Sequence, residues 1–274
     1  MIQISEIYPE TVKYFTSLIG THRPDSAIIL GSGLGEMLDG NDILFEVDTG
    51  DIPGYPVSTV SGHKGKIQLV NVGEKLILAF SGRIHPYEGY KLSQCLLPVH
   101  LSYTAGVQNI IITNAAGGVN PDFSPGDLML ITGINPGALK MKISEFFGTP
   151  LSETTSLLRR FPDPLLYNNL IELGLSENIY LQKGVYWYMS GPNYETPAEI
   201  RMIKNSGGDA VGMSSVHEVL YANALGIRTI GISCITNMGA GISPVKLSHS
   251  EVKETAERVK DKFSRYLKRV LVTL

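Results

Sequence analysis

Short runs of apolar, β-branched residues alternate along the chain with segments whose apolar residues recur at helical spacing. Continuous apolar runs such as I-I-I-T are typical of strands that are covered on both faces. The pattern predicts strands at Ala27–Gly31, Lys66–Val72, Lys75–Ser81, Asn109–Thr113, Asp127–Thr132, Gly184–Met189 and Arg228–Thr236. It predicts helices at Pro9–Ile19, Leu92–Ala105, Leu165–Leu173, Pro197–Ser206, Val216–Leu225 and Ser248–Val272.

This alternation predicts an α/β fold, a single three-layer domain with a mixed, mostly parallel central sheet flanked by helices. The chain shows no internal repeat and no Gly/Ser linker, so we expect its 274 residues to form one domain. The segment Gly133–Pro164 has the weakest pattern, and its content of proline, glycine and threonine predicts a long ordered loop or a lid. Ligands of such folds gather at the C-terminal ends of the strands.

Composition excludes several classes of function. With 23 basic and 26 acidic residues the net charge is −3, and no basic stripe predicts nucleic-acid binding. No stretch approaches the ~18 consecutive apolar residues of a membrane span. Cys95 and Cys234 lie far apart and outside any C-x-x-C pattern, which argues against a disulfide framework or a thiolate zinc site. The first residues do not resemble a secretory signal, so we expect a cytoplasmic protein.

The motif G-S-G-L-G at Gly31–Gly35 directly follows a predicted strand. Glycines in this place let backbone N–H groups approach an anion, and Ser32 adds a hydroxyl donor. A bare structural turn would explain the same residues. A dinucleotide site would need glycine or alanine at position 36, where this chain has Glu36. We therefore favour a loop that binds phosphate or another small anion.

The motif G-R-I-H-P-Y-E-G-Y at Gly82–Tyr90 follows a second predicted strand. Arg83 and His85 alternate, so both side chains can point to one side of an extended segment and bind a phosphate-like dianion. Tyr87 adds an aromatic wall with a polar end, and Glu88 can orient His85 or balance the cations. A surface loop of salt bridges is the alternative.

Three further motifs carry weaker signals for the same kind of ligand. S-G-H-K-G places His63 on a turn, where a plain hairpin is the alternative. The small residues of T-N-A-A-G-G at Thr113–Gly118 let a ligand lie against the backbone, although tight packing of the strand on a helix would also require them. In G-D-A-V-G-M-S, Ser214 precedes a predicted helix, and Met213 can form the apolar floor under a sugar or belong to the core.

A different set of residues suits a heterocyclic base. Glu195 lies just before a predicted helix, where the helix dipole favours its ionised form, and it can accept hydrogen bonds from ring N–H groups. Tyr194 can stack on the same ring; a capping acid and a core tyrosine are the alternatives. Asn237 in T-N-M-G-A-G follows a strand end and can donate to a ring nitrogen, while His249 precedes the final helix. Each of these two is also compatible with a turn or cap.

Taken together, these motifs resemble the trimeric purine nucleoside phosphorylases. G-R-I-H-P-Y-E-G-Y, T-N-A-A-G-G, G-P-N-Y-E-T-P-A-E and D-A-V-G-M-S each match the family, and the matching segments run in the family's order from Gly31 to His249. The segment Gly133–Tyr167 departs from the family's pattern. The resemblance implies the nucleoside phosphorylase fold and a homotrimer.

The resemblance also implies which residues bind each part of the substrates. For inorganic phosphate these are Ser32, His63, Arg83, His85, the backbone at Ala115, and Ser214. For the ribose they are Tyr87, Met213, His249 at the 5′-hydroxyl, and Phe161 of R-F-P-D contributed by a neighbouring subunit. For the base they are Tyr194, Glu195, Val211, Gly212 and Asn237.

The implied reaction is phosphorolysis in purine salvage. Inosine, guanosine or a 2′-deoxy form would react with phosphate to give a free purine and (deoxy)ribose 1-phosphate. No metal or organic cofactor is expected, because phosphate is the co-substrate. Asn237 is the main expected catalytic residue, since its bond to N7 strengthens as the base leaves. His85 and Glu195 complete the expected catalytic set.

The chemistry of Glu195 predicts the base that the pocket accepts. A carboxylate suits a 6-oxopurine, whose N1 carries a proton, whereas the N1 lone pair of adenine would face the anion at a cost of ~1–3 kcal/mol. Related methylthioadenosine phosphorylases have aspartate near Asn237 and an apolar residue in place of His249, so the nucleoside phosphorylase is favoured. A methylthioadenosine phosphorylase, a hydrolytic nucleosidase and a nucleoside-binding protein without turnover are the alternatives.

Overall fold

The computed structural model describes residues 4–60, 65–137, 139–148, 151–243 and 249–274. Its strands are β1 (Ser26–Leu30), β2 (Asp42–Asp48), β3 (Lys66–Val72), β4 (Lys75–Ser81), β5 (Asn109–Gly118), β6 (Leu128–Asn135), β7 (Leu181–Tyr188), β8 (Ala210–Gly212) and β9 (Arg228–Met238). Its α-helices are α1 (Ile4–Ile7), α2 (Pro9–Ile19), α3 (Leu92–Cys95), α4 (Leu97–Thr104), α5 (Leu139–Phe147), α6 (Leu151–Leu158), α7 (Pro164–Ser176), α8 (Pro197–Asn205), α9 (Val216–Ala224) and α10 (His249–Thr273).

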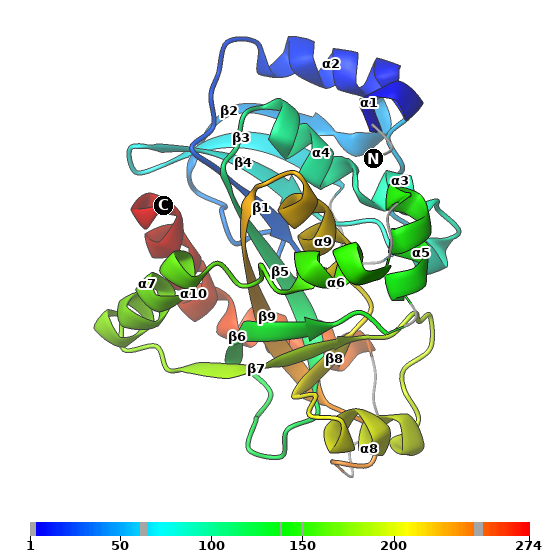
Figure 1. Ribbon diagram of the computed structural model, residues 1–274. Coiled ribbons are helices and arrows are strands. Elements are labelled where there is room, and N and C mark those ends of the chain that lie inside the picture. The colour runs from blue at the N-terminus through cyan, green and yellow to red at the C-terminus, as the bar shows by residue number, and fades with distance from the viewer. Residues whose placement is uncertain (1–3, 61–64, 138, 149–150, 244–248) are drawn as a thin grey trace.

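The strands form one mixed sheet in the order β2-β3-β4-β1-β5-β8-β7-β6-β9, with a further pairing of β5 with β9. β1 pairs in parallel with β4 and β5, and β5 pairs in parallel with β9. The hairpins of β2, β3 and β4 add antiparallel strands at one edge. Because β9 contacts both β5 and β6, the other half of the sheet closes on itself through β6, β7 and β8 (Figure 1).

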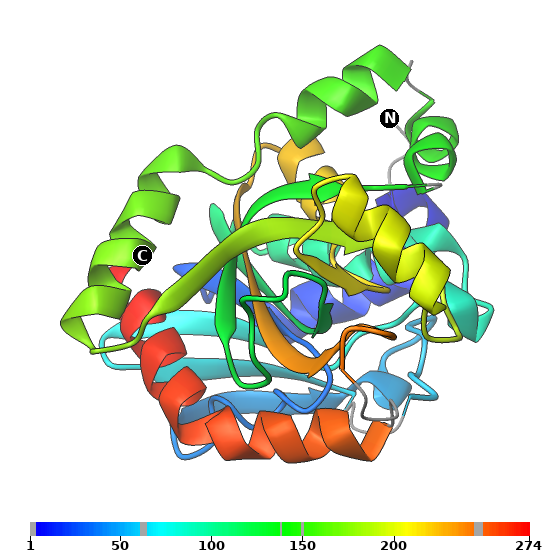
Figure 2. The ribbon, with the colours of Figure 1, turned by 90° about the horizontal axis from the view of Figure 1, so that it is seen from below.

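Helices cover the sheet from both sides. One apolar core joins α2, α4, α5 and α9 to the sheet through buried side chains such as Phe15, Leu101, Ile143 and Tyr221. The second core lies under α7 and α10, and the C-terminal part of α10 reaches α7 in Figure 2. There the Tyr266 hydroxyl of α10 donates to a backbone carbonyl of α7, 2.8 Å away. The structure is therefore the three-layer α/β domain that the alternation of elements predicts.

Most predicted elements are confirmed within a few residues, and two predictions are wrong. The segment Gly133–Pro164 is not a loop or lid, because it contains α5 and α6. In α5, Leu139, Ile143 and Phe147 recur at the helical spacing of four residues and face the core, which explains the helix. The predicted helix Leu92–Ala105 is divided into α3 and α4. No described helix combines the length and the apolar character needed to span a membrane.

The strands that matter most for the site are longer than predicted. The motif T-N-A-A-G-G lies within β5 rather than at the end of a strand that stops at Thr113, and β9 continues to Met238. The two strands stay paired through these extensions. Short side chains in this part of β5 leave room for larger groups of β9, since a Cβ added at Gly118 would lie 2.9 Å from the Met238 sulfur. The paired extensions carry side chains into the pocket described next.

Candidate active site

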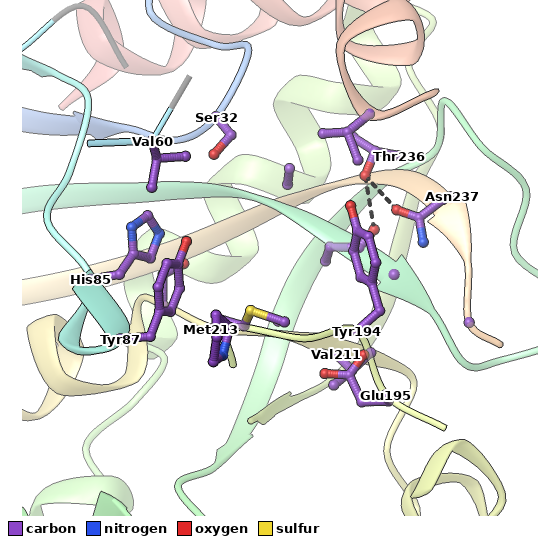
Figure 3. A pocket seen from close by; sticks show the side chains of 18 of the residues that line it. Ser32, Val60, His85, Tyr87, Tyr194, Glu195, Val211, Met213, Thr236 and Asn237 are labelled. Atoms are coloured by element: carbon purple, nitrogen blue, oxygen red, sulfur yellow. Dashed lines mark hydrogen bonds between the residues drawn. The ribbon is translucent and has the colours of Figure 1, made fainter. Parts of the chain in front are cut away.

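One cavity of about 290 Å³ opens where β1, β4, β5 and β9 end. It brings together twelve of the residues predicted from the sequence, which come from distant parts of the chain. They are Ser32, Arg83, His85, Tyr87, Ala115, Tyr194, Glu195, Val211, Gly212, Met213, Ser214 and Asn237. Ser32, His85 and Tyr87 lie at one end of it, Glu195, Thr236 and Asn237 at the other, and Met213 lies between (Figure 3).

Arg83 follows β4 and is held by a buried carboxylate of α9. Its Nη2 lies 2.8 Å from Oε2 of Glu218, and its Nε lies 3.2 Å from Oε1 of the same residue. Its Nη1 donates to the backbone oxygen of Thr113 in β5, 2.8 Å away. The side chains of the pair are 1% and 0% exposed. This fork-to-fork pair fixes the plane of the guanidinium at the wall of the cavity, where its positive charge favours an anion.

His85 is oriented by Glu88 three residues later. The two are linked by a 3.0 Å contact between Nδ1 and Oε1, and the His85 ring stacks on Tyr87 with centroids 4.7 Å apart. Burial lowers the pKa of His85 and outweighs the bond to Glu88, which raises it. Because a carboxylate only accepts, the shared hydrogen lies on Nδ1, and Nε2 of the neutral ring is an acceptor.

The Glu88 carboxylate is itself held by several donors. Oε2 accepts hydrogen bonds from the backbone N–H and the hydroxyl of Thr59, at 2.6 and 2.9 Å, and from the hydroxyl of Ser58 at 3.2 Å. Burial alone would raise the pKa of Glu88, but the hydrogen bonds from His85 and Thr59 outweigh it and lower that pKa to about 2. Glu88 therefore stays ionised and holds His85 in one tautomer.

Two serines precede α9 at the same end of the pocket. Ser214 lines the cavity, and Ser215 follows it with a φ of 68°, a left-handed conformation that non-glycine residues rarely adopt. The side-chain amide of Asn114 in β5 donates to the Ser215 hydroxyl, 2.9 Å away. The turn places the N-terminus of α9 beside the cavity, and the positive end of a helix favours an anion. Hydroxyl, guanidinium and helix terminus thus converge on one place.

The opposite end of the cavity holds a carboxylate with one unpartnered oxygen. Glu195 lies just before α8, and its Oε1 is buried without a hydrogen-bond partner within the part of the chain that the structure describes. Burial raises the pKa of Glu195. Tyr194 beside it is 42% exposed and extends toward Thr236 and Asn237 in Figure 3. An unpartnered acceptor next to an open aromatic face suits a flat ligand that carries an N–H group.

Three predicted residues are not part of this geometry. His63 lies outside the described residues, and so does the side chain of His249, although His249 begins α10. The prediction that Phe161 contacts the sugar of a neighbouring subunit needs correction. Phe161 is 6% exposed and packs into the core of its own chain. A Cβ built on Gly231 would lie 3.1 Å from the Phe161 ring, so the glycine makes room for it. The ring is therefore not free to contact a sugar in a neighbouring subunit.

Glu218 and Thr236 are among the residues of the site that sequence reasoning missed. Glu218 lies 135 positions from Arg83 in the sequence, and only the fold brings them together. Thr236 lines the cavity next to Asn237. A signal for Glu218 was its position as one acidic residue within the otherwise buried first turn of α9. Across the described ranges, no three His, Cys, Asp or Glu side chains form a group that could hold a metal ion.

Comparison with known proteins identifies the class of this fold and site. A family model described as the phosphorylase superfamily matches residues 25–272. Purine nucleoside phosphorylase 1 of Geobacillus stearothermophilus is 42% identical over 256 residues, which cover 90% of either chain. Purine nucleoside phosphorylase of Bos taurus is 35% identical over 280 residues, which cover 98% of this chain and 95% of the bovine one.

A solved structure agrees with these relatives. Isoform 2 of purine nucleoside phosphorylase from Schistosoma mansoni, in complex with cytosine and ribose-1-phosphate, has a TM-score of 0.83 and 32% identity. The comparison covers 100% of this chain and 98% of that one. The chain therefore belongs to the purine nucleoside phosphorylase family within the phosphorylase superfamily.

Proposed function

We propose that this chain catalyses the phosphorolysis of inosine, guanosine and their 2′-deoxy forms to a free purine and (deoxy)ribose 1-phosphate. The observation that carries the proposal is the division of one pocket into a phosphate end and a base end. Arg83 and Ser214 supply groups for the phosphate oxygens, Nε2 of His85 can accept from the O–H group of the phosphate, and the unpartnered Oε1 of Glu195 lies at the opposite end. The solved Schistosoma mansoni relative contains ribose-1-phosphate, the kind of product that this reaction forms.

The proposed reaction moves one glycosyl group. The bond between C1′ and N9 lengthens first, and its electron pair stays with the purine. A phosphate oxygen then forms the new bond to C1′, while a proton from solvent adds at N7 of the departing base. The phosphate dianion stabilises the oxocarbenium-like sugar, and Asn237 stabilises the charge or proton at N7.

Other residues of the pocket have supporting roles in this proposal. Ser32, Arg83, His85, Ser214 and the backbone at Ala115 hold the phosphate. Tyr87 and Met213 pack on the ribose, with His249 at its 5′-hydroxyl, and His63 lies near the phosphate. Tyr194, Glu195, Val211 and Gly212 form the base pocket together with Asn237. We further propose a homotrimer in the cytoplasm that needs no metal or organic cofactor.

Base selectivity follows from Glu195 in the same proposal. Its buried Oε1 gains a hydrogen bond when N1 of a 6-oxopurine donates to it. Adenine presents a lone pair at N1, so the carboxylate would remain unpaired at a cost of ~1–3 kcal/mol. Inosine and guanosine are therefore the preferred substrates, and adenosine is a poor one.

The decisive experiment measures base release from inosine with and without phosphate, with adenosine and methylthioadenosine in parallel. Rapid, phosphate-dependent release of hypoxanthine from inosine is the expected result. Asn237→Ala should lower kcat by about 10²–10³-fold, since one preorganised group at the developing charge is lost. Asn71→Ala on β3 is the matched control, because the Asn71 side chain bonds only to Asp42 of the edge strand β2 among the interactions described.

Other outcomes of this experiment would overturn the proposal. Release of hypoxanthine without phosphate would indicate a hydrolytic nucleosidase. Preference for methylthioadenosine would indicate the related phosphorylase, and binding of inosine without turnover would indicate a binding protein. Normal kcat in Asn237→Ala would contradict the role of Asn237 at the leaving group.

A further inference from the structure

Two consecutive residues of β9, Thr236 and Asn237, both line the cavity. Neighbours in a regular strand point to opposite faces of the sheet, so this arrangement needs a break in the strand. The register supplies it: Ala116 of β5 lies opposite Ile235, and the next residue, Gly117, lies opposite Asn237. Thr236 is therefore the extra residue of a β-bulge, a feature that redirects side chains beside active sites.

The bulge brings the Thr236 hydroxyl to the Asn237 amide. Oγ1 of Thr236 lies 3.0 Å from Oδ1 of Asn237 and 3.4 Å from the backbone oxygen of Ala116. A hydroxyl has one hydrogen, and the shorter contact is the one to the amide (dashed lines, Figure 3). Thr236 and Asn237 are 1% and 5% exposed, so little solvent competes for these bonds.

A second contact supports the same orientation of the amide. Nδ2 of Asn237 donates to the backbone oxygen of Met238, 3.3 Å away. A carbonyl oxygen only accepts, so the nitrogen must lie on the Met238 side and the oxygen on the Thr236 side. Gly117 lies beside the amide, since a Cβ built there would lie 3.4 Å from Nδ2. After both bonds form, the amide retains one N–H and one oxygen lone pair for a ligand.

We propose that Thr236 is a positioning residue, whose hydroxyl fixes the Asn237 amide so that its oxygen accepts the hydrogen bond from N7–H of the leaving purine. The proposal rests on the proposed function, in which that proton arrives from solvent as the C1′–N9 bond breaks. Without the hydroxyl, the amide can rotate and present Nδ2 to N7, where two donors would face each other. Rotation would weaken a bond that matters most in the transition state, so kcat should change more than KM.

The test is a double-mutant cycle in the full-length protein with inosine and phosphate. Thr236→Val keeps the shape and removes the donor, and it should lower kcat by about 10- to 100-fold with both KM values within about threefold. In the Asn237→Ala background the same change should alter kcat by less than about twofold, because the group it positions is gone. Thr236→Ser should restore kcat to within about threefold of the original chain.

A control on the same strand separates positioning from folding. Thr229 of β9 is also buried and its hydroxyl donates to a backbone oxygen, so Thr229→Val should leave kcat unchanged. Equal losses from Thr236→Val in both backgrounds, or a kcat near that of the original chain, would overturn the proposal. So would a Thr236→Ser variant as slow as Thr236→Val. If the original chain itself shows no phosphate-dependent release, the proposed function fails instead.

Discussion

The two ends of the pocket treat buried charge in opposite ways. At the phosphate end, the Arg83 guanidinium is already paired with Glu218 and bonded to Thr113, and the Glu88 carboxylate has several donors. At the base end, Oε1 of Glu195 is buried with no partner among the residues described. One end is assembled before any ligand arrives, whereas the other has an acceptor that no described residue satisfies.

The difference follows from the elements that each end joins. Arg83 follows β4, contacts the backbone of β5 and pairs with α9, so it links three elements of the core. Glu195 lies in the segment before α8 and makes no such link. Loss of one partner from a buried ion pair is costly, because the other charge stays buried alone. We therefore expect the phosphate end to support both folding and activity, and the base end to affect activity alone.

The largest expected effect comes from Arg83→Met. This substitution removes the cation that is proposed to bind the phosphate, and it leaves the Glu218 carboxylate buried without its positive partner. We expect unfolding to need about 3–5 kcal/mol less free energy, and kcat/KM for phosphate to fall at least about 10³-fold. Urea denaturation and steady-state kinetics with varied phosphate measure the two effects.

Arg265→Met is the matched control for this variant. Arg265 is 58% exposed and lies 3.8 Å from Glu177, so its loss should change neither quantity. Phosphate should stabilise the original chain and the control against unfolding, but not Arg83→Met. An Arg83→Met variant that loses activity and keeps its full stability would contradict the link between the two at this end.

Glu195→Gln should separate activity from stability at the base end. The new amide at position 195 replaces the carboxylate that accepts from N1 of a 6-oxopurine, so kcat/KM for inosine should fall about 10- to 100-fold. Because the same amide can donate to N1 of adenine, the preference for inosine over adenosine should decrease. Burial raises the pKa of Glu195, so the folded state resists its ionisation. Removal of that charge should leave the unfolding free energy at pH 7 unchanged or about 1 kcal/mol higher.

The measurements are kinetics on both nucleosides and urea denaturation at pH 7. Glu172→Gln, an exposed carboxylate of α7, is the control and should affect neither. Loss of several kcal/mol of stability in Glu195→Gln would mean that the base end also supports the fold. An unchanged preference for inosine would remove Glu195 as the selecting group.

Sequence reasoning predicted the residues that follow parallel strands. Ser32 follows β1 and Arg83 follows β4, and these two strands pair in parallel. Parallel strands end at the same edge of a sheet, so local motifs at those ends must meet. The apolar strands themselves are visible as short β-branched runs. This much of the fold and site is local information, and the structure agrees with it.

The remaining features depend on contacts between distant segments. The pair of Arg83 and Glu218 needs α9 to pack beside the end of β4. The extension of β5 through Ala-Ala-Gly-Gly is stabilised by its long pairing with β9, although the residues alone are typical of a turn. β8 has three residues, too few for a pattern, and exists because β5 and β7 lie on either side of it. The bulge at Thr236 belongs to the same group, since register is a property of two strands.

The smallest expected effect concerns a buried group near the phosphate end that, unlike Arg83 and Glu88, lacks a partner in the described part of the chain. His217 precedes Glu218 in the first turn of α9, is 0% exposed, and has no hydrogen-bond partner for either ring nitrogen among the residues described. Buried polar groups without partners cost free energy. His217→Leu should therefore raise the unfolding free energy by about 1 kcal/mol at pH 7.5, measured by urea denaturation, with kcat within about twofold of the original chain.

The same variant should also change the pH dependence of stability. Burial lowers the pKa of His217 to about 4, and the nearby Glu218 offsets only part of that shift. Between pH 6.5 and 4 the unfolded chain binds a proton that the folded chain does not, so stability falls as the pH falls. The difference in unfolding free energy between His217→Leu and the original chain should grow by about 2 kcal/mol between pH 7.5 and 5.

His22→Leu, at an exposed position, is the control and should show no such growth. A His217→Leu variant less stable than the original chain at pH 7.5 would mean that the imidazole has a polar partner, and the phosphate end would then be paired throughout.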